Sequence, residues 1–239
     1  TYIVAVNGMY YLNPGYADVR NLIVNGVTEI CQNYNVDGIH FDDYFYPLGA
    51  GNSFDQAAFT ASGQANRSVW RKLCVNAFVK GTYEAVKAVD SGIIFGISPA
   101  GSIASNTGYL CADVRTWCSQ AGYVDYVAPQ LYWGFDHTIS PFDEALAEWE
   151  ALMTNSSVKL IPGLTLSKAN GKTDSNDGSE WTNNKDIIKR QIQLSNTCKN
   201  FGGVIMFSLA DIYNPANNSY VSTLVSERNN FEPVLKALY

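Results

Sequence analysis

The sequence predicts an α/β fold built on a parallel sheet, and three observations support this prediction. Short apolar runs alternate with segments that carry apolar residues at helical spacing. These runs are continuous rather than alternating, as expected for strands that are buried on both faces. Several of them end in loops rich in polar and aromatic residues. In barrels and open α/β sheets, ligands bind at that end of the strands.

Five segments are strand candidates because they are short, apolar and rich in β-branched residues. In chain order they cover residues 36–41, 93–98, 124–131, 158–164 and 203–208. The apolar periodicity predicts helices over residues 16–34, 69–89, 109–121, 141–153 and 184–199. Asn7-Gly8 separates two short β-rich segments, so we expect a hairpin at the N-terminal end of the sequence.

Two aspartates begin strand candidates, in Asn35-Val-Asp-Gly and in Tyr123-Val-Asp-Tyr. Asp37 and Asp125 therefore lie at the amino ends of parallel strands, on the face away from the expected ligand site. We interpret both as structural capping residues.

The amino-acid composition favours some classes of binding partner and argues against others. Charged residues make up only 16% of the 239 residues and aromatic residues 13%. This balance suits a neutral polar ligand with apolar faces, such as a sugar, although an aromatic-rich core explains it equally well. The net charge of −6 argues against a nucleic-acid partner, which requires clustered Lys and Arg. Because no apolar run approaches the roughly 20 residues of a membrane-spanning helix, we expect no transmembrane segment.

The five cysteines give no disulfide or zinc pattern. Cys111 and Cys118 are seven residues apart on a predicted helix, which places them roughly 10 Å apart, too far for a disulfide. With no Cys-x-x-Cys pair, we expect free buried thiols and no metal or cofactor. The acidic run from Asp174 to Glu180 departs from the spacing of a calcium loop and is predicted to be a solvated loop.

Four segments of the sequence form specific motifs: Tyr11-Leu-Asn-Pro-Gly-Tyr-Ala-Asp-Val-Arg, Asn33-Tyr-Asn-Val-Asp-Gly-Ile-His-Phe-Asp-Asp-Tyr-Phe-Tyr-Pro, Phe95-Gly-Ile-Ser-Pro-Ala-Gly and Asp125-Tyr-Val-Ala-Pro-Gln-Leu-Tyr-Trp-Gly-Phe-Asp-His. Together these segments resemble the glycosyl-hydrolase-like 10 family. They occur in order over nearly the whole chain. One departure is the run Arg71-Lys-Leu-Cys-Val-Asn, where Leu73 and Cys74 replace two polar residues of the family pattern.

The resemblance implies a (β/α)8 TIM barrel that hydrolyses glycosidic bonds, mostly in exported bacterial proteins with cell-wall glycan as substrate. It also implies that the five strands are barrel strands four to eight. We therefore expect residues 1–239 to form a single, N-terminally incomplete barrel domain. The implied location is extracellular or in the cell envelope, and the implied partner is a polysaccharide. The oligomeric state is not predicted.

Asp42 and Asp43 end the first strand candidate and are the expected catalytic residues. Side chains alternate along a strand, so Gly38, His40 and Asp42 share one face, which should point into the barrel. Two neighbouring carboxylates in a partly dry pocket cannot both ionise cheaply, so one can act as an acid and the other as a base. For Asp43, a structural role as acceptor of loop amide hydrogen bonds is an equal alternative.

The other strand ends supply candidate binding groups. We expect Gln130 and Tyr132 to contact hydroxyls or an acetamide, Trp133 to stack on a sugar, and His40 to orient Asp42 from a buried position. Further candidates are Tyr44, Ser98 and Asp136. Core packing is the alternative for one of Gln130, Tyr132 and Trp133. All these groups should converge at the carboxyl end of the strands.

No second catalytic acid occurs at a strand end. Glycosidases usually use two separated carboxylates, so three explanations stay open. The second acid lies outside this sequence, Asp136 supplies it, or the substrate's own acetamido group attacks the anomeric carbon and the Asp pair suffices. The alternative to a glycosidase is a carbohydrate-binding or degenerate barrel without turnover. Another type of barrel hydrolase has no support, because the sequence lacks a nucleophilic serine elbow and a metal-ligand cluster.

Overall fold

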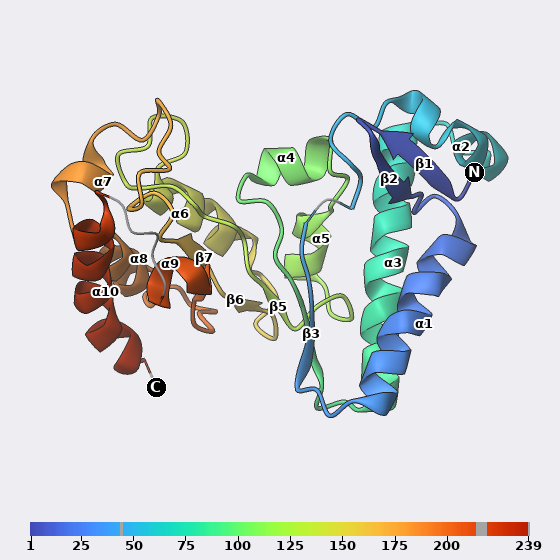
Figure 1. Cartoon of the computed structure of the whole chain (residues 1–239). Helices are drawn as coiled ribbons and strands as arrows, with labels where there is room; N and C mark the ends of the chain where they lie inside the picture. Colours follow the sequence, from blue (N-terminus) through green and yellow to red (C-terminus); the bar gives the residue numbers. More distant parts are fainter. Residues whose placement is uncertain (44, 214–218, 239) are drawn as a thin grey trace. The chain divides into compact units, whose positions relative to one another are not determined.

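The computed structural model describes residues 1–43, 45–213 and 219–238. The chain divides into two compact units, Thr1–Asp125 and Tyr126–Tyr239. Each unit combines short parallel strands with helices (Figure 1). In the part of the chain that the structure describes, no helix is long and apolar enough to cross a membrane.

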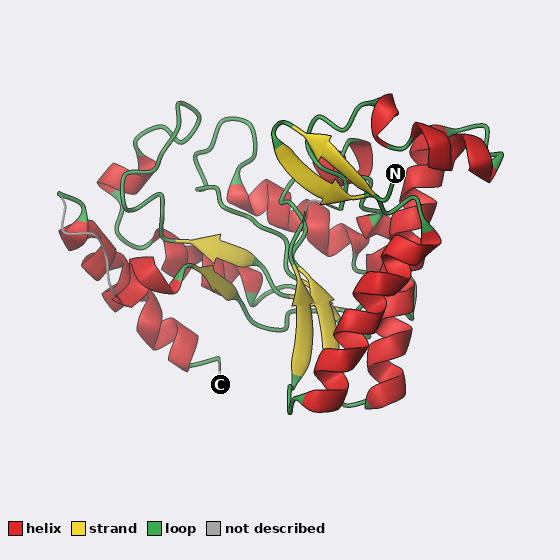
Figure 2. Ribbon diagram, turned by 45° about the vertical axis from the view of Figure 1, so that its right-hand side comes forward, coloured by secondary structure: helices red, strands yellow, loops and turns green. Residues whose placement is uncertain are grey.

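The first unit opens with the predicted hairpin beside the N-terminus (Figure 2). Strands β1 (Ile3–Val6) and β2 (Met9–Leu12) pair antiparallel, with Val6 opposite Met9. Asn7 and Gly8 form the turn with φ of 50° and 80°. Positive φ at both positions is what a tight hairpin turn requires, and Asn and Gly adopt it at low cost.

Two long helices form the scaffold of the first unit. Helix α1 (Ala17–Asn33) packs against α3 (Arg67–Val89), and both lie close to their predicted bounds. Shorter helices follow: α2 (Gln56–Ser62), α4 (Ile103–Gly108) and α5 (Val114–Ser119), with a single 3-10 turn at Asn52–Phe54. Strands β3 (Gly38–Phe41) and β4 (Ile94–Ile97) pair in parallel, with Phe41 opposite Ile97.

The predicted helix over residues 109–121 is wrong in its first part. Cys111 has a φ of 57°, which no right-handed helix accommodates, and α5 begins only at Val114. The Asp113 side chain accepts a hydrogen bond from the Thr116 amide and so caps the new start. The spacing argument for Cys111 and Cys118 therefore used a helix that does not include Cys111.

All five cysteines are nonetheless buried free thiols: Cys31, Cys74, Cys111, Cys118 and Cys198. Burial raises the pKa of Cys118 to about 12 and that of Cys111 to about 11. These thiols stay protonated at neutral pH and act as small apolar core groups.

The second unit contains two parallel strand pairs. Strand β5 (Tyr126–Val127) pairs with β6 (Lys159–Leu160), and β7 (Gly163–Thr165) pairs with β8 (Ile205–Phe207). The segment 158–164, predicted as one strand, is thus two. Pro162 lies between them and has no N–H to continue a ladder, which explains the break.

Five helices are described in the second unit: α6 (Phe142–Leu152), α7 (Glu180–Asn183), α8 (Ile187–Ser195), α9 (Leu209–Tyr213) and α10 (Val221–Lys236). Helices α6 and α8 correspond to two predicted helices, whereas α7, α9 and α10 were not predicted. Helix α10 packs against α8 through buried residues that include Leu224 and Phe231.

Asp125 has the structural role predicted for it. Its Oδ2 accepts a hydrogen bond of 2.7 Å from the Phe95 amide and lies 2.8 Å from Lys87 Nζ. The carboxylate thus fixes the entry to β4. For Asp37, the main-chain oxygen accepts a 3.0 Å hydrogen bond from the Ile94 amide, and a capping role of its side chain stays a prediction.

The run that departs from the family pattern contributes to the core. Arg71 is buried, and its Nε donates to Asp55 Oδ2 at 2.6 Å. Cys74 packs with Trp70 in a small apolar cluster, whereas Leu73 is 52% exposed. Of these two residues, Cys74 thus contributes a core contact and Leu73 does not.

Candidate active site

Strand β3 presents two different faces. Ile39 and Phe41 are half-buried, and the Phe41 ring stacks on Phe78 of α3 at a centroid distance of 5.5 Å. Gly38 and His40, on the opposite face, are exposed. Phe41 therefore faces the helices as predicted. That the opposite face points into a barrel stays a prediction.

A cavity of about 470 Å³ lies between the hairpin, α1, α3 and the end of β3. Five of the fourteen residues that line it are aromatic: Tyr10, Tyr11, Phe41, Phe45 and Phe78. Three charged side chains, Arg20, Asp42 and Asp43, also line it. An aromatic cavity with a few polar groups is the usual form of a small-molecule site, and here it contains both predicted catalytic residues.

The two aspartates have different environments. Asp43 is half-buried, and its Oδ1 is buried without a hydrogen-bond partner among the described residues. Burial, together with the charge of Asp42, raises the pKa of Asp43 to about 6. Asp42 is exposed and its Oδ1 accepts a 3.0 Å hydrogen bond from the Asp43 amide. The arrangement holds Asp43 as a carboxyl group that keeps its proton to a higher pH than an ordinary aspartate.

His40 lies two residues before Asp42 on the same face, but the prediction that it is buried is wrong. The ring is exposed on one side because β3 leaves that face open in the first unit. Desolvation on its packed side lowers the pKa of His40, and the Asp42 charge partly opposes this. His40 is therefore held toward its neutral form, in which one ring nitrogen can accept a hydrogen bond.

Ser98 belongs to the same group of residues. It follows β4, is buried, and donates its amide hydrogen to the Phe41 main-chain oxygen at 2.8 Å. The parallel register therefore brings Ser98 next to the segment that carries Asp42. Tyr44, also a predicted binding residue, lies outside the described residues.

The other predicted binding residues lie in the second unit. Gln130 is half-buried and forms a parallel bridge with Gly163. Tyr132 is half-buried and stacks on Phe207 at 5.8 Å, with the ring planes 19° apart. Trp133 is half-buried and packs 5.9 Å from the His137 ring. None of the three side chains is fully buried. Their convergence with Asp42 stays a prediction.

Two residues of this region were missed by sequence reasoning. Phe207 ends β8, is 57% exposed, and extends the aromatic surface of Tyr132. Its position at the end of a predicted strand could have identified it as a candidate binding residue. Glu180 is 3% exposed and its Oε2 accepts a 3.0 Å hydrogen bond from the amide of Asp136, which itself is exposed. Glu180 follows no strand, so the sequence contained no comparable signal for it.

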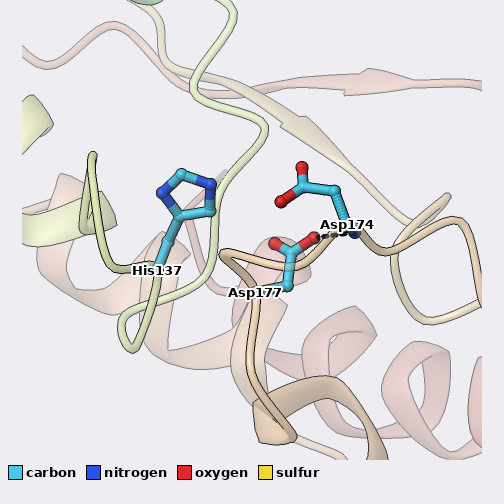
Figure 3. Close-up of side chains that lie close together, drawn as sticks. All are labelled: His137, Asp174 and Asp177. Carbon is cyan, nitrogen blue, oxygen red and sulfur yellow. Dashed lines mark hydrogen bonds between the residues drawn. The ribbon is translucent and has the colours of Figure 1, made fainter.

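Figure 3 shows three potential metal ligands of the second unit side by side, His137, Asp174 and Asp177. Lys168 Nζ already forms ion pairs with both carboxylates, at 2.6 Å from Asp177 Oδ2 and 3.2 Å from Asp174 Oδ2. The Ser140 amide donates to His137 Nδ1, so this nitrogen is already occupied as a hydrogen-bond acceptor. This arrangement fits an ion-paired loop better than a metal site. The prediction of a solvated loop is wrong for Asp177, which is buried.

Comparison with known proteins decides the family. A family model described as Glycosyl hydrolase-like 10 matches residues 1–183. This chain belongs to the glycosyl hydrolase-like 10 family. The match covers both aspartates, the loop after β5 and Glu180, so the resemblance predicted from the sequence motifs is confirmed.

Two bacterial relatives of this glycosyl hydrolase-like 10 chain carry glycosyl hydrolase names. The chain is 33% identical to "Glycosyl hydrolase YngK" of Bacillus subtilis strain 168 over 231 residues, which is 88% of this chain and 44% of that protein. It is 28% identical to "Glycosyl hydrolase DigH" of Escherichia coli K12 over 236 residues, which is 91% of this chain and 53% of that protein. The chain thus spans about half the length of these relatives.

One solved structure also resembles the chain, the spore cortex-lytic enzyme SleL of Bacillus megaterium QM B1551. The TM-score is 0.53 at 14% identity, over 90% of this chain and 54% of that one. At this identity the likeness concerns the fold alone. It agrees with the parallel strand pairs described above and supports an α/β fold.

Proposed function

We propose that this protein is a glycosidase that cleaves an N-acetylhexosamine polysaccharide of the bacterial cell wall. The observation that carries the proposal is the half-buried Asp43, with a pKa of about 6, beside the exposed Asp42 in an aromatic cavity. Membership of a glycosyl hydrolase-like family supports a glycosidase-type enzyme. The bacterial relatives support a bacterial source, and we propose an extracellular or cell-envelope location, where such a polymer is found.

The proposed reaction uses the substrate's acetamido group as nucleophile. Asp43, in its protonated form, gives its proton to the glycosidic oxygen as the bond from that oxygen to the anomeric carbon breaks. The acetamido carbonyl oxygen forms a new bond to the anomeric carbon, and the Asp42 carboxylate accepts a hydrogen bond from the acetamido N–H. Water then attacks the same carbon as the bond from this carbon to the acetamido oxygen breaks, and a proton of the water passes to Asp43, which restores both the enzyme and the acetamido group.

Adjacent aspartates suit this reaction better than a two-carboxylate mechanism. A retaining mechanism with an enzyme nucleophile needs carboxyl groups about 5 Å apart on opposite sides of the bond, and inversion needs more. Asp42 and Asp43 are neighbours in sequence, linked by the hydrogen bond from the Asp43 amide to Asp42 Oδ1. They can reach the leaving oxygen and the acetamido group, because these substituents belong to neighbouring sugar carbons.

The sugar-binding surface in this proposal comes from the second unit. Tyr132 and Phe207 offer a stacked aromatic pair, and Trp133 a further ring, for the apolar faces of sugars. Gln130 can hydrogen-bond hydroxyls or the acetamide. We propose that the parallel strands are strands four to eight of a (β/α)8 barrel.

The test is release of reducing ends from purified cell-wall glycan by the protein in the form that its organism makes. Asp42→Asn should lower turnover by roughly 10²- to 10³-fold, the scale of a lost electrostatic contact to charge that develops in the transition state. Asp37→Asn is the matched control, because Asp37 is exposed at the opposite end of the same strand. Glycan binding without turnover by the wild type would favour a non-catalytic carbohydrate-binding barrel instead.

A further inference from the structure

The loop from Leu131 to Ser140, which follows β5, carries the candidate sugar-binding residues Tyr132, Trp133 and Asp136. A binding group on a loop is useful only when the loop backbone is fixed. In the second unit this loop is anchored by side chains of α7 and α8, all of them from one segment of the chain, residues 180–191.

Glu180, the first residue of α7, makes the central contact. It is 3% exposed, and its Oε2 accepts the 3.0 Å hydrogen bond from the Asp136 amide. Burial raises the pKa of this carboxyl group, and the hydrogen bond from the Asp136 amide opposes the shift. The carboxylate therefore holds the main chain of the loop at Asp136, between Trp133 and His137.

Gly134 lets the loop approach this carboxylate. A Cβ added at Gly134 would lie 2.0 Å from Glu180 Oε2 and 3.0 Å from Trp181 Nε1. Real Cβ atoms do not approach an oxygen this closely. Position 134 therefore requires a residue without a side chain, which is glycine.

The neighbouring α8 (Ile187–Ser195) supplies two more contacts. Gln191 Nε2 donates to the Trp133 main-chain oxygen at 2.7 Å. The Arg190 guanidinium lies 4.3 Å from the Phe135 ring centroid, and its Nη1 lies 3.8 Å from Glu180 Oε1. Side chains of α7 and α8 thus contact three residues of the loop: Trp133, Phe135 and Asp136.

We infer that Glu180 is a positioning residue that sets the affinity for the glycan by fixing the loop carrying Trp133 and Asp136. This inference rests on the proposed function, since it assigns the loop to glycan binding. Glu180 is not a catalytic residue, because its carboxylate is buried against the main chain of the loop. It acts through the residues whose backbone it holds. A displacement of about 1 Å in a binding group can cost on the order of 10²-fold in rate or affinity.

The test combines steady-state kinetics on an N-acetylglucosamine hexasaccharide with amide hydrogen exchange of residues 133–137. Glu180→Ala should raise KM by about 10- to 100-fold, change kcat by less than about threefold, and speed exchange at Phe135 and Asp136. Glu180→Gln keeps one acceptor oxygen and should rescue part of both effects. Glu148→Ala, an exposed acid on α6, is the control and should change neither quantity.

Gly134 provides a second, independent variant. Gly134→Ala should reproduce the KM and exchange effects of Glu180→Ala, because its methyl group forces the loop off the carboxylate. In the Glu180→Ala background the same substitution should add little, since the closest obstacle to the methyl group, Glu180 Oε2, is then removed. Additive effects of the two substitutions would overturn the inference, as would faster exchange with an unchanged KM, or a raised KM with unchanged exchange.

The kinetic and the hydrogen-exchange measurements together also distinguish failure of this inference from failure of the proposed function. A wild-type protein that neither binds nor cleaves the hexasaccharide contradicts the proposed function, and the binding role of Glu180 fails with it. Exchange then still decides whether Glu180 holds the loop. A wild type that cleaves the hexasaccharide with a KM indifferent to Glu180→Gln, Glu180→Ala and Gly134→Ala overturns the inference alone.

Discussion

The main-chain amide of Asp43 donates a 3.0 Å hydrogen bond to Oδ1 of Asp42. This bond gives Asp42 a fixed acceptor role, while Oδ1 of Asp43 stays buried without a hydrogen-bond partner in the described part of the chain. The amide-accepting role falls to Asp42, and the raised pKa of about 6 makes Asp43 the better proton donor.

The pH dependence of kcat tests this assignment. A proton donor must be protonated, so activity that depends on Asp43 should be full below pH 6 and lost as pH rises through about 6. Asp43→Asn should lower kcat by roughly 10²- to 10⁴-fold and remove this alkaline limb. Activity that rises between pH 6 and pH 8 would contradict the assignment of Asp43 as the acid.

The stacked pair of Tyr132 and Phe207 should bind the apolar face of a sugar. Phe207→Ala should raise KM about tenfold, which corresponds to roughly 50 Å² of apolar contact at about 25 cal/mol per Å². Tyr34→Ala, which removes an exposed aromatic ring outside the candidate site, should leave KM unchanged. Equal KM values for Phe207→Ala and the wild type would remove Phe207 from the binding surface.

Glu227 should make the stability of the protein depend on pH. It is fully buried on α10 and accepts hydrogen bonds from the amides of Ile187 and Ile188, at 3.1 and 3.2 Å, at the start of α8. Burial raises its pKa to about 7, although these two amides oppose the shift. A carboxyl group with a raised folded-state pKa stabilises most below its unfolded pKa of about 4.5, and this contribution is lost as pH rises through 7.

The free energy of unfolding in urea at pH 5 and at pH 8 measures this effect. The wild type should lose up to roughly 3 kcal/mol between the two values, from about 1.4 kcal/mol per pKa unit. Glu227→Gln cannot ionise and should not show this loss. Glu232→Gln, a half-exposed acid on the same helix, should keep the wild-type slope. Identical slopes for Glu227→Gln and the wild type would contradict the prediction.

Local signals in the sequence predicted much of the fold. Asn7-Gly8 predicted the hairpin, because the positive φ of both turn residues is a property of the residues themselves. The apolar spacing of residues 69–89 predicted α3 within two residues of its start. Apolar content alone failed at Pro162, where the missing amide breaks a run that hydropathy treats as continuous.

The candidate site was predicted in part. Asp42 and Asp43 could be predicted from the sequence because they end an apolar strand candidate, and the alternation of side chains along a strand predicts which face Asp42 shares with His40. Their unequal pKa values were not, since these depend on how much water the surrounding chain excludes. Glu180 could not be predicted, because its role depends on its contact with Gly134. The two residues are 46 positions apart in the sequence, and only the folded chain brings them together.

The most direct test of the central claim compares hydrolysis of two oligosaccharides of equal length and linkage, one of N-acetylglucosamine and one of glucose. If the acetamido group is the nucleophile, the wild type should cleave the N-acetylated substrate at least roughly 10²-fold faster, since an oriented intramolecular group replaces a bimolecular step. The difference should appear in kcat as well as in KM. Equal kcat values for the two substrates would contradict a substrate-assisted mechanism centred on Asp42 and Asp43.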